Sequence, residues 1–400
     1  IAIIGSGPAG LTAAHDLILK GYEVSIFEAA AVAGGILSSA IPDFILSKEA
    51  VQRDIEYIKA LGVHIHTGIK IGKDFTLEAL QQRGFAVILV AIGNQKSVIL
   101  KIPGANLTGV RSALEYLKEA KGGLTKPVRG KVWVIGGGAV AMDCARTAIR
   151  QGAAEVHIAC LESRETMPAF TWEIEAAERE GVRTHPAFAP QEFTSRTGTK
   201  VNGIKFQRVA ANWIDAAGRV KWTLAEGAGT EVVIDADLVV VAIGQTMDAA
   251  GLATESVKIN DRGVININEA TGETGDKGIF AAGDAAGNGR TVTDAMAAGR
   301  KAAVAIDQYL NGQIMSPAKE SRGVITIEPE QVPSYFVRRE RWEIPKLTTK
   351  QAIKTNQEVN LGYTRWQAMD EANRCLNCRM CANCVFERGQ LCYDTAMRLL

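Results

Sequence analysis

Short apolar runs that end at glycine-rich turns recur along this chain of 400 residues. The first run, Ile1–Ile4, continues into the turn Gly5-Ser-Gly-Pro-Ala-Gly10 and then into small residues that are typical of a helix start. A second run, Lys131-Val-Trp-Val-Ile135, continues into Gly136-Gly-Gly-Ala-Val-Ala141 in the same way. Apolar runs of this length between turns are typical of buried strands. The pattern therefore predicts the succession of strand, glycine turn and helix twice, as in α/β proteins with parallel sheets.

The first glycine turn has the spacing of a dinucleotide-binding loop. Gly5 permits the tight turn, Gly7 lets the backbone approach a pyrophosphate, and Gly10 lets helix and strand pack closely. The helix N-terminus offers N–H donors to the phosphates. The strand Val24–Glu28 ends in a carboxylate, placed where an acid binds ribose hydroxyls. The residues predicted to bind this dinucleotide are Gly5, Gly7, Pro8, Ala9, Gly10 and Glu28.

The second glycine turn predicts a second dinucleotide, held by Gly136, Gly138, Ala139, Val140 and Ala141. The alternative is an internal duplication in which one of the two sites no longer binds. When one chain binds two such cofactors, a flavin and a nicotinamide form the economical pair, because the flavin accepts a hydride and releases electrons singly. The sequence thus favours FAD together with NAD(P)H.

A later segment reads as a strand, a Gly-Asp turn and a helix. The strand Gly278-Ile-Phe-Ala-Ala ends at Gly283-Asp284, and helix-forming residues follow Thr291-Val-Thr293. An aspartate at such a strand end can bind a ribityl chain, and a helix start can lie beneath the flavin ring. We therefore expect Gly283, Asp284, Thr291 and Thr293 to complete the FAD site.

Five of the seven cysteines lie in the last thirty residues, at Cys375, Cys378, Cys381, Cys384 and Cys392. Thiolates at this spacing can hold a 4Fe–4S cluster, whose iron prefers sulfur donors from one short loop. A zinc site is the alternative, although zinc usually takes two C-x2-C pairs that lie further apart. Closely spaced thiols also favour a reducing cytoplasm over secretion with disulfides.

Composition narrows the possible partners. The net charge of +1 gives no reason to expect nucleic acid or an anionic membrane surface. No apolar run is long enough to span a membrane, and the opening run is too short for a signal peptide. The chain does not begin with Met, so we expect that upstream residues are missing. The five histidines have no ligand spacing, and we assign them no role.

Taken together, these motifs resemble the two-dinucleotide flavoproteins and, among them, the small (beta) subunit of glutamate synthase and its relatives. The likeness extends over nearly the whole chain, including a form with a C-terminal ferredoxin-like cysteine segment. Beyond the two glycine turns, it is carried by Gly34-Gly-Ile-Leu37, Ala40-Ile-Pro-Asp-Phe44, Ala91-Ile-Gly93, Ile102-Pro-Gly104, Arg164-Glu-Thr-Met-Pro-Ala169, Ala242-Ile-Gly-Gln245, Gly283-Asp284, the run from Asp294 to Arg300, Leu361-Gly-Tyr-Thr364 and Glu371-Ala-Asn-Arg-Cys-Leu-Asn-Cys378.

The resemblance implies an α/β fold with two Rossmann-like domains, in which the nicotinamide domain is inserted in the FAD domain. The implied FAD domain covers 1–110 and 246–315, and the NAD(P) domain covers 111–245. A connector and helix at 316–372 and an iron–sulfur segment at 373–400 follow. The resemblance adds Gly34, Gly35, Ala91 and Gly93 to the FAD site, and Gly244, Glu162 and Arg164 to the NAD(P) site.

The resemblance also implies an electron-input role, in which NAD(P)H reduces FAD and electrons leave through the cluster to a partner subunit or a ferredoxin-like acceptor in a hetero-oligomeric complex. The first alternative is a ferredoxin:NAD(P) oxidoreductase that works in reverse or bifurcates electrons. The second is a structural subunit without nicotinamide turnover. Disulfide reductases of this fold need a redox-active cysteine pair, and Cys144 and Cys160 do not form a C-x-x-C motif.

Three departures from relatives modify these expectations. Cys160, Leu161 and Glu162 replace a tyrosine and two arginines, and a carboxylate repels the 2′-phosphate of NADP, so NADH is expected over NADPH although Arg164 remains. Relatives carry a helical iron–sulfur domain before the flavin loop, so either this sequence is a fragment or another subunit supplies those clusters. Ser38 and Ile45 stand where relatives often have arginines, so contacts to a missing domain or to the cofactor are expected to differ.

The favoured cluster ligands are Cys378, Cys381, Cys384 and Cys392. Tyr393 stands where ferredoxin-like loops have Pro after the last cysteine, so Cys375, Cys378 and Cys381 with Cys392 form the alternative set.

Overall fold

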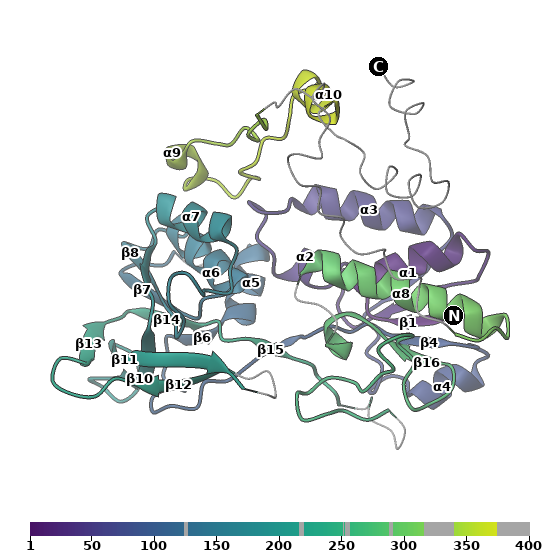
Figure 1. The fold of residues 1–400 in the computed structure, drawn as a ribbon, viewed down its shortest axis with the longest axis horizontal. Helices are drawn as coiled ribbons and strands as arrows, with labels where there is room; N and C mark the ends of the chain where they lie inside the picture. The colour runs from purple at the N-terminus through teal and green to yellow at the C-terminus, as the bar shows by residue number, and fades with distance from the viewer. Residues whose placement is uncertain are drawn as a thin grey trace, which may run out of the picture. The chain divides into compact units, whose positions relative to one another are not determined.

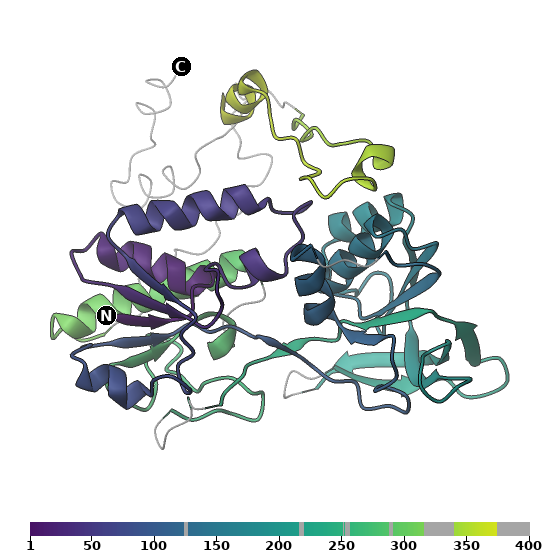
Figure 2. The same cartoon turned by 180° about the vertical axis from the view of Figure 1, so that it is seen from behind.

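The computed structural model describes residues 1–123, 127–215, 220–250, 252, 257–287, 291–315 and 340–373. Chain contacts divide it into two units, Ile1–Ala318 with Thr348–Glu358, and Lys319–Leu347 with Val359–Leu400. The larger unit contains two parallel sheets, each covered by helices, and Figures 1 and 2 show them from opposite sides.

The first sheet has the strand order β16-β4-β1-β2-β3, and every neighbouring pair is parallel. Four strands come from the start of the chain: β1 (Ala2–Ile4), β2 (Ser25–Glu28), β3 (His64–Thr67) and β4 (Ile88–Val90). The fifth, β16 (Ile279–Ala281), comes from much later and pairs with β4. The first sheet is thus assembled from two distant parts of the chain, as the resemblance implied.

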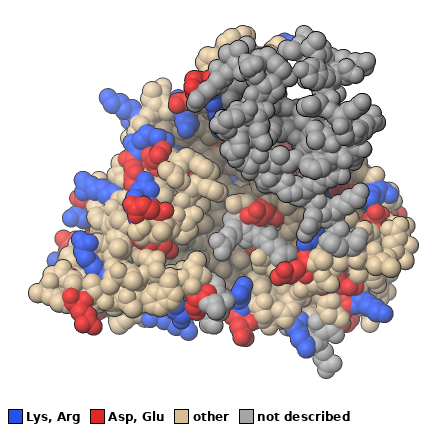
Figure 3. Space-filling model, viewed as in Figure 1, with Lys and Arg blue, Asp and Glu red and all other residues tan. Residues whose placement is uncertain are grey.

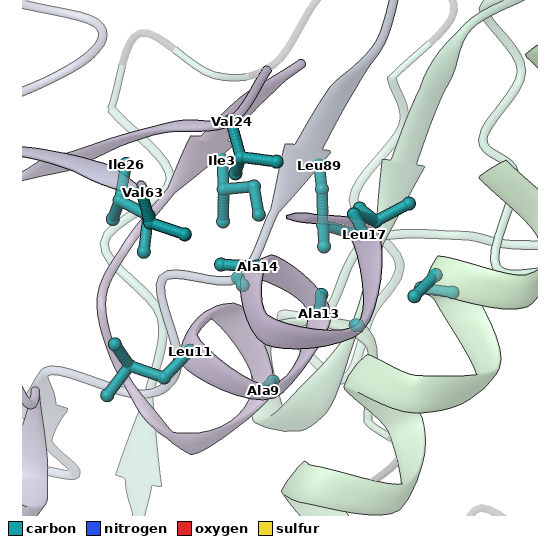
Figure 4. Close-up of a cluster of buried hydrophobic side chains, with 14 of the residues drawn as sticks. Ile3, Ala9, Leu11, Ala13, Ala14, Leu17, Val24, Ile26, Val63 and Leu89 are labelled. Carbon is teal, nitrogen blue, oxygen red and sulfur yellow. The ribbon is translucent and has the colours of Figure 1, made fainter. Parts of the chain in front are cut away.

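Helices α1 (Pro8–Ile18), α3 (Lys48–Ala60) and α8 (Val292–Leu310) share one hydrophobic cluster with this sheet. Figure 4 shows Ile3 and Leu89 of the strands pointing toward Ala13 and Leu17 of α1. The other face of the sheet packs in a separate cluster that includes Leu77 and Leu80 of α4 (Leu77–Gln82). Both faces are covered over the central strands β1 and β4, which is why these two read as continuous apolar runs, whereas the edge strand β3 is polar and largely exposed.

Helices α1 and α8 approach closely because α8 carries a glycine at the contact. A Cβ at Gly299 would lie 2.2 Å from the backbone oxygen of Ala9. Any larger residue would force the helices apart, and α1 is the helix that follows the first glycine turn. Gly299 therefore fixes the position of α1 beneath the loop.

The second sheet has the order β6-β14-β7-β8-β9 and is again parallel. Its strands are β6 (Val110–Ser112), β7 (Lys131–Ile135), β8 (Glu155–Ala159), β9 (Arg183–His185) and β14 (Leu238–Val241). Helices α5 (Ala113–Lys121), α6 (Ala139–Arg150) and α7 (Thr171–Arg179) share one cluster with it. An antiparallel sheet packs in a second cluster and consists of β10 (Phe188–Thr194), β11 (Gly203–Ile214), β12 (Val220–Leu224) and β13 (Glu231–Asp235).

Two short antiparallel strands, β5 (Lys96–Ser97) and β15 (Gln245–Thr246), join the sheets. They follow Gly93 and Gly244, which belong to two of the motifs that carry the resemblance. The fold prediction is confirmed at this level, because one dinucleotide-type sheet is inserted in the sequence of the other. The limits at 110, 245 and 315 stay predictions.

The remaining helices are short: α2 (Ile36–Ser39), the 3₁₀ helix η1 (Gly283–Ala286), α9 (Thr349–Ala352) and α10 (Arg365–Asn373). Helix α10 starts with a capping box, in which Thr364 N donates to Gln367 Oε1 at 2.9 Å and Gln367 N donates to Thr364 Oγ1 at 3.2 Å. Within the smaller unit, Trp342 Nε1 donates to Asp370 of α10 at 2.8 Å and holds the chain against the helix.

Candidate functional site

The first glycine turn is closed on the protein side and open on the other. A Cβ at Gly5 would lie 2.5 Å from Ala91 O, and one at Gly10 would lie 2.1 Å from Gly5 O. A Cβ at Gly7, the N-cap of α1, would meet no atom within 4 Å. The loop therefore needs glycine for packing at two positions, while at the third it leaves room for a ligand against the free N–H groups of α1.

The carboxylate of Glu28 holds this loop in place through hydrogen bonds from Ser6 and Ala30. The carboxylate is buried, with 9% of the residue exposed, and accepts from Ser6 N at 3.0 Å, Ser6 Oγ at 2.5 Å and Ala30 N at 2.8 Å. Ser6 Oγ in turn accepts from Gly34 N at 2.9 Å. Ser6 is a loop-shaping residue that the glycine spacing alone did not identify. The predicted contact of Glu28 with a ribose stays a prediction, and its observed role is to hold two loops together.

The predicted residues Gly34 and Gly35 form that second loop. Both have positive φ, 112° and 56°, and a Cβ at Gly35 would lie 2.9 Å from Gly7 Cα. Ala91 N donates to Ile4 O at 2.8 Å at the end of β4, and Gly93 follows with φ 65°. The structure thus brings the loops at 5–10, 34–35 and 91–93 to the carboxyl end of the first sheet, where open α/β sheets bind their ligands.

The late segment reaches the same end of this sheet through β16. Gly283 has φ 71°, and a Cβ there would lie 3.0 Å from Ala9 Cβ, so the turn lies against α1. Burial, together with the neighbouring Asp294 carboxylate, raises the pKa of Asp284 above its usual range. Thr291 caps α8 by accepting from Asp294 N at 3.1 Å, whereas Thr293 is exposed on the first turn. The open glycine leaves room for a pyrophosphate, the helix N-terminus donates hydrogen bonds to it, and the desolvated carboxylate can accept from ribityl hydroxyls, so this group of residues fits FAD.

The second glycine turn repeats the design of the first. A Cβ at Gly136 would lie 2.2 Å from Ala242 O, whereas one at Gly138 would meet nothing within 4 Å. Gly138 is the N-cap of α6, so Ala139, Val140 and Ala141 supply its first N–H groups. Gly244 follows β14 with φ 122°, and its oxygen accepts from Val98 N at 3.0 Å. The open face of Gly138 and the start of α6 fit a second pyrophosphate.

Glu162 lies against this turn and Arg164 points elsewhere. A Cβ at Gly137 would lie 3.2 Å from Glu162 Oε2, which places the carboxylate at the glycine turn. Arg164 Nη2 donates to Glu178 Oε2 of α7 at 3.2 Å. Of the two charges predicted near the coenzyme, the structure brings only the negative one to the glycine turn.

Cys144 and Cys160 are buried, free thiols. Burial raises the pKa of Cys160 to about 12 and raises that of Cys144 well above its usual value. Thiolate is the reactive form, so neither residue suits disulfide chemistry. The prediction that they form no redox pair agrees with this burial.

The sequence analysis missed a buried ion network on the later turns of α6. Arg146 and Arg150 of α6 both bind Glu180 in two-pronged pairs, with the shortest contacts at 2.7 and 2.5 Å. The Arg150 guanidinium lies 3.8 Å from the ring centre of Phe44. Lys121 of α5 donates to Leu37 O at 2.8 Å, in the same segment as Phe44. The conspicuous Ala40-Ile-Pro-Asp-Phe44 motif thus joins the first glycine loops to the second domain.

All five cysteines of the predicted cluster lie outside the described residues. Within the described ranges, no group of His, Cys, Asp or Glu side chains has the arrangement of a metal site, and none of the helices could cross a bilayer. Among the described residues on the face shown in Figure 3, Lys and Arg are interspersed with Asp and Glu.

Comparisons with known proteins agree with this geometry. Residues 1–299 match the family model described as pyridine nucleotide-disulphide oxidoreductase. The chain is 37% identical over 94% of its length to the NADP(+)-dependent formate dehydrogenase subunit beta of Moorella thermoacetica, of which it covers 54%. It is 35% identical over 79% of its length to the NADPH glutamate synthase small chain of Azospirillum brasilense, of which it covers 68%. The chain therefore spans about half the length of the formate dehydrogenase subunit.

Solved structures show the same fold at low identity. Mycobacterium tuberculosis FprA in complex with NADPH has a TM-score of 0.66 at 18% identity and matches 78% of this chain and 84% of that one. Thioredoxin reductase of T. acidophilum has a TM-score of 0.58 at 22% identity and matches 78% of this chain and 97% of that one. The chain therefore belongs to the pyridine nucleotide-disulphide oxidoreductase family, within the group of glutamate synthase small chains and related beta subunits.

Proposed function

We propose that this chain is the electron-input part of a larger assembly, which oxidises NAD(P)H with bound FAD and delivers electrons to an iron–sulfur acceptor. The observation that carries the proposal is the pair of glycine turns, each packed tightly on one side and open at Gly7 or Gly138. Relatives named as subunits of formate dehydrogenase and of glutamate synthase support a hetero-oligomeric partner.

The residues proposed for FAD are those that surround the first turn. Gly7 and the first N–H groups of α1 would receive the pyrophosphate, and Asp284 lies at the end of β16, within reach of a hydroxylated chain. The loop at Gly34 and Gly35 is linked to the first glycine turn by the hydrogen bond from Gly34 N to Ser6 Oγ. Glu28 holds the same turn by accepting from Ser6 Oγ. When bound, FAD accepts a hydride from a nicotinamide and releases electrons one at a time.

The proposed coenzyme is NADH rather than NADPH. A carboxylate beside the glycine turn accepts hydrogen bonds from free ribose hydroxyls and repels a 2′-phosphate. Glu162 occupies that place, and Arg164 is paired with Glu178 on α7. The relatives at 35% to 37% identity are named for NADP(H), so the preference rests on Glu162 alone.

The proposed exit for the electrons is a 4Fe–4S cluster held by Cys378, Cys381, Cys384 and Cys392. This assignment rests on cysteine spacing alone. An iron and acid-labile sulfide count of about four each per chain, with no zinc, is the expected result. A count of one zinc and no sulfide would replace the cluster by a zinc site.

Anaerobic stopped-flow bleaching of the flavin by NADH and by NADPH tests the activity. We expect rapid bleaching by NADH, slower bleaching by NADPH, and a reversed preference in Glu162→Arg. No bleaching by either coenzyme would contradict the electron-input function, whereas faster bleaching by NADPH would contradict only the role of Glu162.

Two matched variants separate the cofactor sites. Gly138→Asp and Gly7→Asp each place a carboxylate where a Cβ meets nothing within 4 Å, so neither disturbs the packing of the protein itself. We expect Gly138→Asp to keep its flavin and lose bleaching, because the carboxylate repels a pyrophosphate at α6. Gly7→Asp should purify without flavin. If both variants retained both properties, the two turns would not be the cofactor sites.

A further inference from the structure

A cavity of about 480 Å³ lies between the two sheets of the second domain, away from both glycine turns. One wall is formed by β7, β8 and β9, and the other by the antiparallel sheet. This volume is within the range of sites that hold small organic molecules. Its lining is Lys131, Trp133, Glu155, His157, His185, Phe188, Phe206 and the strand Val232–Asp235.

The cavity is distinct from the coenzyme site. Lys131 and Glu155, which begin β7 and β8, both line it. The turn at Gly136 follows the opposite end of β7, about 16 Å from Lys131 for five residues of strand, whereas His185 and Phe188 of the lining lie toward that opposite end. A ligand at the Lys131 end of the cavity would therefore leave the glycine turn free.

Flat side chains dominate the deep wall of the cavity. Trp133 stacks on His157 with ring centres 4.4 Å apart and planes at 11°, and its ring centre lies 4.9 Å from that of His185 and 5.3 Å from that of Phe206. Such rings offer faces and edges that favour another flat π-system over a bulky aliphatic group.

The histidines give this wall a defined set of donors and acceptors. His157 Nε2 lies 3.3 Å from Glu155 Oε2, and because a carboxylate only accepts, His157 Nε2 carries the hydrogen. His157 Nδ1 then accepts from His185 Nε2 at 3.0 Å, which leaves His185 Nδ1 as an acceptor. Burial lowers the pKa of both histidines, so both rings are neutral near pH 7.

Trp133 contributes an unused donor. Trp133 is 5% exposed, and its indole Nε1 is buried without a hydrogen-bond partner among the described residues. A buried N–H normally finds a partner, so an indole left without one beside a cavity marks a place for a ligand acceptor. Trp133 thus adds a donor to the acceptor at His185.

The charges around the cavity balance. Lys131 and Glu155 lie 3.9 Å apart, Arg183 donates to Glu155 at 3.1 Å, and Asp235 adds a second carboxylate. This mixture gives no preference for a strongly anionic or cationic ligand. It suits an uncharged molecule with polar edges.

We propose that this cavity binds an uncharged, planar heteroaromatic molecule of about nucleobase size, which stacks in the ring cluster and accepts a hydrogen bond from Trp133 Nε1. It is a second small-molecule site of the nicotinamide domain, separate from the coenzyme. The proposal does not depend on the coenzyme preference or on the electron acceptor.

Saturation-transfer NMR with three probes tests the site on the full chain loaded with FAD and saturated in separate samples with NAD⁺ and with NADP⁺, so that whichever coenzyme binds leaves neither glycine turn open to a probe. The probes are adenine, which is flat with donors and acceptors, indole, which is flat without a ring acceptor, and cyclohexanol, which is not flat. We expect affinity to fall in that order. Binding of cyclohexanol as tight as that of adenine would overturn the proposal, as would no detectable adenine binding at millimolar concentration.

Variants place the bound probe. Val232 pairs with Phe206 across β13 and β11 and is 39% exposed, so Val232→Trp should fill the cavity mouth and weaken adenine binding at least tenfold. Val220→Trp, at a β12 position that is 42% exposed and outside the lining, should bind as the parent does. Trp133→Phe keeps a ring and removes the N–H, and should bind adenine about fivefold more weakly. Adenine binding that is unchanged in both Val232→Trp and Trp133→Phe would refute the site.

Discussion

Replacing the buried Glu180 by alanine should destabilise the protein more than removal of an exposed charged side chain from the same helix. Glu180 caps α7 and has 5% of its side chain exposed, and its partners Arg146 and Arg150 have 6% and 3% exposed. The carboxylate accepts four hydrogen bonds from the two guanidinium groups, at 2.5 to 3.1 Å. Without it, two positive charges would remain buried side by side.

The expected loss is about 3–5 kcal/mol in the free energy of unfolding, because removal of one partner of a buried ion pair leaves an uncompensated charge. Part of the cost is offset by Phe44, whose ring receives the Arg150 guanidinium at 3.8 Å. A contact of this kind stabilises by about 0.5–2 kcal/mol, too little to replace the carboxylate.

Urea unfolding followed by circular dichroism, with FAD bound, measures this loss. The matched control is Glu175→Ala on the same helix, whose partner Arg179 lies 3.7 Å away with about half of each side chain exposed. The control should cost at most about 0.5 kcal/mol, because exposed pairs are screened by water. Equal midpoints for the two variants would refute the reasoning that burial sets the cost.

The pH dependence gives a second check on the same residue. Burial alone would raise the pKa of Glu180, but the hydrogen bonds from Arg150 and Arg146 outweigh it and hold the pKa below the usual range. A depressed carboxylate pKa stabilises the folded state above the unfolded value of about 4.3 and loses that contribution as the pH falls through the folded value. Parent and Glu180→Ala should therefore differ fully above about pH 5 and converge below it.

Three further predictions concern single sites. Burial, then the carboxylate of Glu173, raises the pKa of Asp143 to about 7, so its folding penalty grows as the pH rises from about 4 to 7. Asp143→Asn should raise the free energy of unfolding in urea by roughly 2–4 kcal/mol at pH 8 and leave it nearly unchanged at pH 4. Gly299→Ala should destabilise by about 1–3 kcal/mol through its contact with Ala9, and a higher melting temperature would mean that helix propensity outweighs packing. Thr364→Ala should speed amide exchange in α10 about fivefold, because it removes a cap that stabilises by about 1 kcal/mol.

The sequence predicted the two nucleotide folds well because glycine spacing and short apolar runs are local properties. Gly5, Gly10 and Gly136 are required by backbone oxygens 2.1 to 2.5 Å from a would-be Cβ, and such close contacts leave only glycine. The cap at Thr364 was also predictable, since both partners lie within one turn.

What the sequence did not predict depends on residues that are distant along the chain. The hydrogen bonds that Glu28 accepts from Ser6 and Ala30 were not predicted from its place after a strand, while its contact with a ribose stays a prediction. Glu180 is an ordinary helix-end acid until folding brings two turns of α6 against it. His157 and His185 have no ligand spacing, and only the pairing of β8 with β9 makes them neighbours.

Arg150 also reaches beyond its domain core. Its Nε donates to the backbone oxygen of Thr355 at 3.2 Å, just after α9, whose Ala352 is 2% exposed. The chain from this fixed point to the end of α10 can extend about 45 Å at most, since part of it is helical. The segment 355–373, which precedes the cysteines in the sequence, is therefore a tether whose first residue is hydrogen-bonded to α6, the helix that follows the second glycine turn. Any rotation of that domain moves the fastened end and shifts the region that the tether can reach.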